Sequence, residues 1–288
     1  MKPIFDLLRV KQWVKNLFLL IPAFFAGTLF DFENAKVLLL GVVCFSFIAS
    51  SVYIINDYRD RHHDLIHPLK KNRPIASGKV SLQTAIFVFA FLAITGLTFA
   101  FYIDRIFFFL VLFYLILNMG YSFGLKNVPI LDLFIVASGF LIRVHSGGIL
   151  SNVPVSQWLS IMILLLALFI IIAKRRDDLV LQDKIGVDLR KVSKSYNLEF
   201  TNSCMTLLSA IILVAYIMYT VSPEVTDRFN NQYLYTTTIF VMAGIMRYLQ
   251  ITFVEKKSGS PTEILLKDKF ILITILGWII TFYFLIYF

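Results

Sequence analysis

The sequence predicts an all-α integral membrane protein, folded as a bundle of nine transmembrane helices. Composition is the first reason: apolar residues make up 58% of the 288 residues and charged residues 16%, whereas a soluble domain carries about 25% charge. The mean hydropathy of +0.79 agrees. The second reason is that nine apolar stretches approach the length of about 20 residues that a spanning helix requires. An ordinary soluble enzyme, a disordered chain, a coiled coil and a disulfide scaffold are therefore disfavoured.

The expected spans follow one another along the whole chain. The first is short and begins inside a polar segment, and it leads into the second without the small-residue pattern of a signal-peptide cleavage site. No hydrophilic stretch is long enough for a separate domain, so residues 1–288 are expected to form a single transmembrane domain. The spans are 16–30, 36–56, 82–102, 106–122, 129–149, 157–173, 203–221, 233–251 and 270–287.

Residues 1–15 precede the first span and mix apolar side chains with four cations. This pattern predicts an amphipathic helix in the membrane interface; a frayed tail that anchors the orientation is the alternative. The two cysteines, Cys44 and Cys204, lie in separate apolar stretches without metal-site spacing, so both are expected to be buried thiols.

The positive charge is concentrated on one side of the predicted topology. Of the 27 lysines and arginines, 23 fall in the N-terminus and in the connections 57–81, 126, 174–201 and 247–269. Three fall on the other side, and Arg143 lies within a span. This asymmetry predicts a protein of the plasma (inner) membrane with a cytoplasmic N-terminus and an external C-terminus. Membrane orientation thus explains the net charge of +9, and no nucleic-acid partner is expected.

An acidic motif stands at the end of the second span. If the helix continues past Ile55, Asp57, Asp60 and Asp64 lie within about 60° of one another on one face. Like charges at this spacing repel and require a cation. Carboxylates prefer hard metals, and Mg²⁺ is usually held by one or two carboxylates together with substrate phosphates. The motif therefore predicts a Mg²⁺-diphosphate site; a solvated helix end paired with neighbouring cations is the alternative.

A basic loop follows the acidic motif. Pro68 and Pro74 end a helix and Gly78 permits a turn. Between them stand Lys70 and Arg73, which provide a point charge and a forked donor for phosphate oxygens. The acidic motif, the expected metal ion and the basic loop together predict a cytoplasmic pocket for a polyanion.

The segment from Asn56 to Gly78 resembles the motif of the UbiA-type intramembrane prenyltransferase superfamily, an NDxxDxxxD sequence followed by a basic RPxxSG loop within nine spans. Further segments are similar to the polyprenyl-phosphate phosphoribosyltransferase branch of that superfamily. They are residues 11–16 (KQWVKN), His67-Pro68, Tyr121-Ser122 with Lys126, and Lys174-Arg175.

The resemblance implies an enzyme that transfers 5-phosphoribose from phosphoribosyl diphosphate to a polyprenyl phosphate in the membrane and releases diphosphate. It implies Mg²⁺ at Asp57, Asp60 and Asp64, with Asn56 holding an aspartate or a ribose hydroxyl. Two phosphorylated substrates need many cations. The residues assigned to phosphate or ribose on this basis are Lys15, Asn16, Lys70, Arg73, Lys126, Lys174 and Arg175.

Two further residues have open roles. Tyr121 either closes the pocket or anchors a span end in the interface. Arg143, deep in the fifth span, either contacts the lipid phosphate or takes part in a structural ion pair. Beside it, Gly147 and Gly148 are expected to permit close helix packing.

Two other functions stay open. Prenyl transfer to an aromatic or other small acceptor is one, because Asp177-Asp178 after the sixth span departs from the phosphoribosyltransferase pattern. A membrane transporter is the other, although transporter sites usually lie near the membrane midplane.

Overall fold

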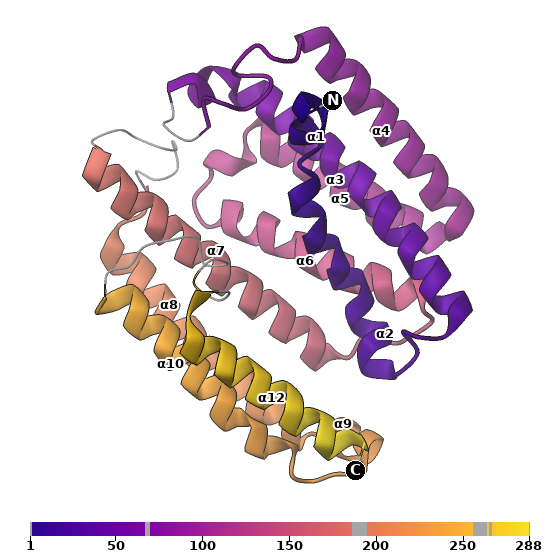
Figure 1. Ribbon diagram of the computed structural model, residues 1–288, viewed down its shortest axis with the longest axis vertical. Helices are drawn as coiled ribbons and strands as arrows, with labels where there is room; N and C mark the ends of the chain where they lie inside the picture. The colour runs from indigo at the N-terminus through magenta and orange to yellow at the C-terminus, as the bar shows by residue number, and fades with distance from the viewer. Residues whose placement is uncertain (1, 67–69, 186–194, 256–263, 265–266, 288) are drawn as a thin grey trace. The chain divides into compact units, whose positions relative to one another are not determined.

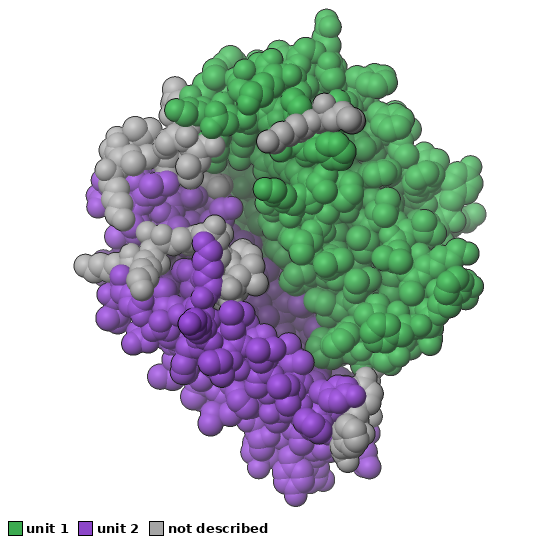
Figure 2. Space-filling model, viewed as in Figure 1, with its two compact units in different colours: residues 1–156 green, residues 157–288 purple. Residues whose placement is uncertain are grey.

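The structure is a computed structural model that describes residues 2–66, 70–185, 195–255, 264 and 267–287. Within these ranges the chain forms α- and 3-10 helices and no strand, which confirms the predicted all-α class. The chain divides into two compact units, residues 1–156 and 157–288, drawn in two colours in Figure 2. The expectation of a single domain stays a prediction, and each unit is described by itself.

The helices of both units follow the apolar stretches of the sequence (Figure 1). The first unit contains α1 (Lys2–Leu8), η1 (Val10–Leu20), α2 (Ile21–Ala26), α3 (Phe32–Ile66), α4 (Leu82–Ile103), α5 (Arg105–Phe123), η2 (Leu125–Asn127) and α6 (Leu131–Leu150). The second unit contains α7 (Gln157–Ile185), α8 (Leu198–Val221), α9 (Pro223–Phe229), η4 (Leu234–Thr237), α10 (Thr238–Phe253) and α12 (Lys269–Tyr287).

Six of the described helices, α3 to α8 without the short η2, are long and apolar enough to cross a membrane. The protein is therefore a multi-pass membrane protein. Beyond these six, α10 has 16 residues and α12 contributes a shorter apolar stretch, Lys269–Leu285. The described part of the chain thus supports six spans by length, and the predicted count of nine is not established.

The N-terminal region is more broken than the sequence predicts. The expected helix over 1–15 is divided at Arg9, which has a left-handed backbone (φ 50°). The expected span 16–30 is divided between η1 and α2, because Pro22 stands in the first turn of α2 and Gly27 ends it at φ 75°. Apolar composition predicts burial here, but it does not report these backbone breaks.

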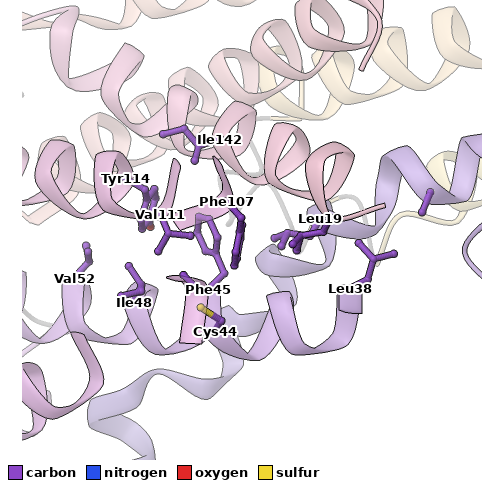
Figure 3. Packing of buried hydrophobic residues seen from close by; sticks show 13 residues of the cluster. Leu19, Leu38, Cys44, Phe45, Ile48, Val52, Phe107, Val111, Tyr114 and Ile142 are labelled. Carbon is purple, nitrogen blue, oxygen red and sulfur yellow. The ribbon is translucent and has the colours of Figure 1, made fainter. Parts of the chain in front are cut away.

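In the first unit, α3 and α6 are the central helices. The most apolar 18-residue window of each is 61% buried, against 22% for α4 and α5. Figure 3 shows Phe45 of α3 packed against Phe107, Val111 and Tyr114 of α5 in one buried cluster. Most phenylalanines of α4 and α5 outside this cluster remain exposed, as a lipid-facing surface requires.

Gly147 of α6 permits a close backbone approach within the first unit. A Cβ placed on Gly147 would lie 1.8 Å from the carbonyl oxygen of Leu19, and one on Gly148 would lie 2.8 Å from that of Val153. The expected close packing at this glycine pair is confirmed. It fixes η1, which carries several predicted site residues, against α6.

Candidate active site

The acidic motif lies on the last turns of α3, which continues without a break to Ile66. Asp57 and Asp64 are 2% and 3% exposed. Both face Arg73, whose Nη1 lies 3.1 Å from Asp57 Oδ1 and 2.7 Å from Asp64 Oδ2. The predicted helical continuation is confirmed, and two of the three acids share one guanidinium.

The loop after α3 holds Arg73 in place through its own backbone. The amide of Ser77 donates to the Arg73 carbonyl at 2.8 Å, and the amide of Val80 donates to the Pro74 carbonyl at 3.0 Å. Gly78 supplies a left-handed turn at φ 73°. Because Val80 is also buried in the core, the loop is a compact support for the guanidinium.

Asp60 has a separate set of partners. Lys126, in η2 after α5, pairs with Asp60 Oδ1, and Asn56 Nδ2 donates to Asp60 Oδ2 at 3.2 Å. The other amide atom of Asn56, Oδ1, is buried without a hydrogen-bond partner among the described residues. A buried acceptor of this kind is costly unless a ligand satisfies it.

Arg9 is a member of this site that the sequence did not single out. Its Nη2 lies 2.5 Å from Asp57 Oδ1, and its guanidinium stacks on the ring of Tyr53 at 4.9 Å. The pair joins residues 48 positions apart. Within the sequence, Arg9 is one of several cations in a basic N-terminal run, and no pattern distinguishes it from the others.

A second polar group surrounds Arg143 inside the first unit. Arg143 Nε donates to Asn16 Oδ1 at 2.8 Å, and its Nη2 donates to the Tyr114 hydroxyl at 3.1 Å. Its Nη1 donates to the backbone carbonyl of Gly139 at 2.7 Å. Asn16 Nδ2 in turn donates to Ser46 at 2.8 Å. These contacts of Arg143 are with neutral groups, and Tyr114 is a second partner that sequence reasoning missed, because a tyrosine in an apolar span gives no separate signal.

Lys15 lies between these two groups along η1. Burial and, to a smaller extent, the charges of Arg143 and Arg9 lower the pKa of the Lys15 amine to about 8. No hydrogen bond or ion pair reaches this amine from the described residues. The protonated form of this half-buried amine is destabilised by the two neighbouring guanidinium charges. A bound anion would stabilise it.

The remaining predicted residues are dispersed. Lys70 begins the loop, and its charge acts on Asp64. Tyr121 is half-buried near the end of α5. Lys174 and Arg175 lie on α7 in the second unit, where Arg175 Nη1 stands 3.8 Å from Asp178 Oδ2. The predicted phosphate contacts of these residues stay predictions, and His67 and Pro68 lie outside the described residues.

Chemically, the donor set suits a hard cation. Asp57, Asp60 and the unsatisfied Asn56 Oδ1 are oxygen donors, which Mg²⁺ prefers. In the described part of the chain, no three His, Cys, Asp or Glu side chains are grouped closely enough to hold one ion. Each acid is instead paired with Arg9, Arg73 or Lys126. The residues fit Mg²⁺ by type, and binding requires these cations to give up carboxylate oxygens.

A multi-pass helical bundle with an acid-rich, cation-lined site at the end of α3 is the arrangement of a membrane-embedded enzyme. Residues 17–186 match the UbiA prenyltransferase family, and the chain belongs to this family.

Relatives that match nearly the whole chain give a more specific comparison than the family does. The chain is 34% identical to a decaprenyl-phosphate phosphoribosyltransferase from Mycolicibacterium smegmatis, over 97% of this chain and 91% of that protein. It is 30% identical to the enzyme of the same name from Corynebacterium glutamicum, over 94% of this chain and 83% of that protein. The structure is similar to that of a UbiA homologue from Archaeoglobus fulgidus bound to DMAPP and Mg²⁺, with a TM-score of 0.72, 20% identity and 98% of both chains covered. This last likeness concerns the fold.

Proposed function

We propose that the protein transfers the 5-phosphoribosyl group of phosphoribosyl diphosphate to a polyprenyl phosphate and releases diphosphate. The observation that carries this proposal is similarity at 30–34% identity, over nearly the whole chain, to decaprenyl-phosphate phosphoribosyltransferases. The cation-rich surroundings of the acidic motif support it, because donor and acceptor bring several phosphate groups to one site.

The acids and the cations have complementary roles in this reaction. Asp57, Asp60 and Asp64, with Asn56 Oδ1, are the proposed Mg²⁺ ligands. When bound, the metal neutralises charge that develops on the leaving diphosphate. Arg73, whose guanidinium bridges two of the acids, is the proposed contact for phosphate oxygens.

The chemistry of the transfer needs little more than positioning. C1 of the ribose gains oxocarbenium character, by analogy with glycoside hydrolysis. The lipid phosphate oxygen attacks from the opposite face, which inverts C1. No general base is required because a phosphate anion is already a nucleophile, so the residues act through orientation and electrostatics.

The proposed setting is the inner membrane, with the acidic motif and the N-terminus in the cytoplasm and the C-terminus outside. The distribution of lysine and arginine along the chain supports this orientation. It would place the site where a soluble, charged sugar donor is available.

A donor assay tests the proposal. Purified protein with Mg²⁺, a polyprenyl phosphate and labelled phosphoribosyl diphosphate is expected to yield a labelled phosphoribosyl lipid. Omission of the lipid phosphate controls for hydrolysis. Absence of labelled lipid, with turnover of a prenyl diphosphate instead, would contradict the proposed donor.

That outcome would favour the second candidate, prenyl transfer to a small acceptor. Its supporting observation is the acid pair Asp177-Asp178 on α7, together with a family whose solved members include homologues bound to prenyl diphosphates and Mg²⁺. The two candidates share a diphosphate leaving group and differ in the group transferred.

A further inference from the structure

Arg9 has a backbone conformation that its residue type does not favour. It is the single residue between α1 and η1, at φ 50° and ψ 46°. For a residue other than glycine this region costs about 1–2 kcal/mol, and it persists where the surroundings fix it. The contacts around Arg9 show what fixes it here.

One serine of α3 fastens the chain on both sides of Arg9. Ser50 Oγ donates to the Leu8 carbonyl at 2.7 Å and accepts from Trp13 Nε1 at 3.0 Å. Before the turn, Leu7 is fully buried in a core cluster with Ile54. The backbone that carries Arg9 is therefore docked onto α3, one helical turn or two from the acidic motif.

This docking brings two guanidiniums to one carboxylate oxygen. Asp57 Oδ1 lies 2.5 Å from Arg9 Nη2 and 3.1 Å from Arg73 Nη1. Each of the three acids is paired with a cation from this chain, so a free divalent ion would have to displace a guanidinium without giving it a new partner. A metal–diphosphate complex brings phosphate oxygens, which arginine binds in forked pairs.

We propose that Arg9 is a diphosphate-binding residue that pairs with Asp57 in the ligand-free protein and passes to a phosphate oxygen when the metal–diphosphate complex enters. The inference rests on the proposed function only in that the site takes a diphosphate. It makes the N-terminal segment part of the site, and it makes metal and diphosphate bind together rather than in sequence.

Binding of Mn²⁺, followed by electron paramagnetic resonance of the free ion, tests the exchange without turnover. For the full chain in detergent, inorganic diphosphate is expected to tighten Mn²⁺ binding about tenfold or more. Arg9→Gly, which keeps the left-handed turn, is expected to bind Mn²⁺ alone more tightly, because Asp57 loses a competing cation. It should also bind the Mn²⁺–diphosphate complex about tenfold more weakly than the wild type. Arg9→Lys should recover part of that loss.

A neighbouring arginine provides the matched control. Arg61 also stands on the last turns of α3, but its guanidinium stacks on Tyr58 at 4.7 Å and donates to the Tyr58 carbonyl. Arg61→Ala is expected to bind Mn²⁺ and diphosphate like the wild type. Wild-type diphosphate binding by Arg9→Gly would overturn the proposal, and so would weaker binding of Mn²⁺ alone.

The probe separates this test from the donor assay. Inorganic diphosphate is the leaving group of both phosphoribosyl and prenyl donors. If the donor assay fails but the Mn²⁺ results are as expected, the proposed identity of the transferred group is wrong and the proposed role of Arg9 is unaffected. If the donor assay succeeds but the Mn²⁺ results are not as expected, only the proposed role of Arg9 is wrong.

Discussion

The three acids of α3 stand close together because they have partners. Carboxylates three and seven positions apart on one helix face repel each other, and burial of Asp57 and Asp64 makes the repulsion stronger. Arg9, Arg73 and Lys126 compensate it in the ligand-free chain. If the same three cations pass to phosphate oxygens when substrate binds, as proposed, one set of residues would both stabilise the acids and bind the leaving group.

Asp57→Asn is expected to reduce kcat about 100-fold or more, because the amide keeps the volume but loses the charge that holds a metal on the diphosphate. Stability should fall by only about 1–3 kcal/mol, since the two guanidiniums facing Asp57 are partly exposed to solvent. Labelled-lipid formation and the thermal midpoint are the measurements. Asp6→Asn, an exposed acid of α1, is the control, and turnover of Asp57→Asn within a few-fold of the wild type would remove the metal-ligand role.

The lowered pKa of Lys15 predicts that activity and stability change in opposite directions as pH rises. Its folded pKa of about 8 lies below the unfolded value of 10.5, so the unfolded chain binds the extra proton between these pH values, and folding becomes more favourable as pH rises through this window. If the charged amine binds a phosphate, kcat/KM for the donor should fall over the same rise. Rate profiles from pH 6.5 to 9.5 measure this. In Lys15→Arg, kcat/KM should decline less as pH rises. A pH profile of this variant that is the same as the wild-type profile would count against the phosphate contact.

The sequence predicted the residues of the site better than their partners. The spacing of the acids, the basic loop and Lys126 follow from local pattern and from family resemblance, and they meet in the structure. Arg9 with Asp57, and Arg143 with Tyr114, join residues 48 and 29 positions apart. Such contacts depend on how helices pack, which no single-helix pattern records.

Among the helices, the contact between η1 and α6 depends on a missing side chain. The carbonyl oxygen of Leu19 occupies the position of a Cβ on Gly147. Because the obstacle is backbone, it cannot move aside as a flexible side chain does. The strict glycine requirement at this crossing keeps Lys15 and Asn16 in register with Arg143.

Gly147→Ala is therefore expected to destabilise the protein by about 1–3 kcal/mol and to reduce activity, because η1 must shift away from α6. Thermal unfolding in detergent measures the first effect and the donor assay the second. Gly120→Ala in α5 is the matched control: its Cβ would meet only the Leu125 side chain, at 3.1 Å, and alanine favours a helix. Equal midpoints for the two variants would contradict the close contact at Gly147.

Helix positions were predictable and helix breaks were not. Seven of the nine expected spans coincide with single described helices, since long apolar runs have few alternatives in a membrane, and the span 233–251 is divided between η4 and α10. The first expected span, 16–30, is divided between η1, which ends at Leu20, and α2, which begins at Ile21. Pro22 in the first turn of α2 and the left-handed Gly27 mark this division, whereas apolar composition alone predicted a continuous span.

For the whole molecule, the number of crossings decides which side of the membrane the C-terminus faces. Six crossings, which the described helices support by length, would return it to the side of the N-terminus. The charge distribution predicts the opposite side, which requires an odd number. At 16 residues, α10 spans about 24 Å of a core about 30 Å thick. The preceding η4 can extend it toward the full thickness.

A topology experiment therefore tests the two short elements that follow the basic loop, α10 with η4 and α12. Alkaline phosphatase fused after Phe288 is expected to be active, since that enzyme folds only outside the cytoplasm, and a green fluorescent protein fused there should be dark. The control pair, fused after Gly78 in the basic loop, should give the reverse result, because the loop and its cations are predicted to be cytoplasmic. The same result at both positions would mean an even number of crossings between them, so that the charge-based topology, and with it the external C-terminus, would be wrong.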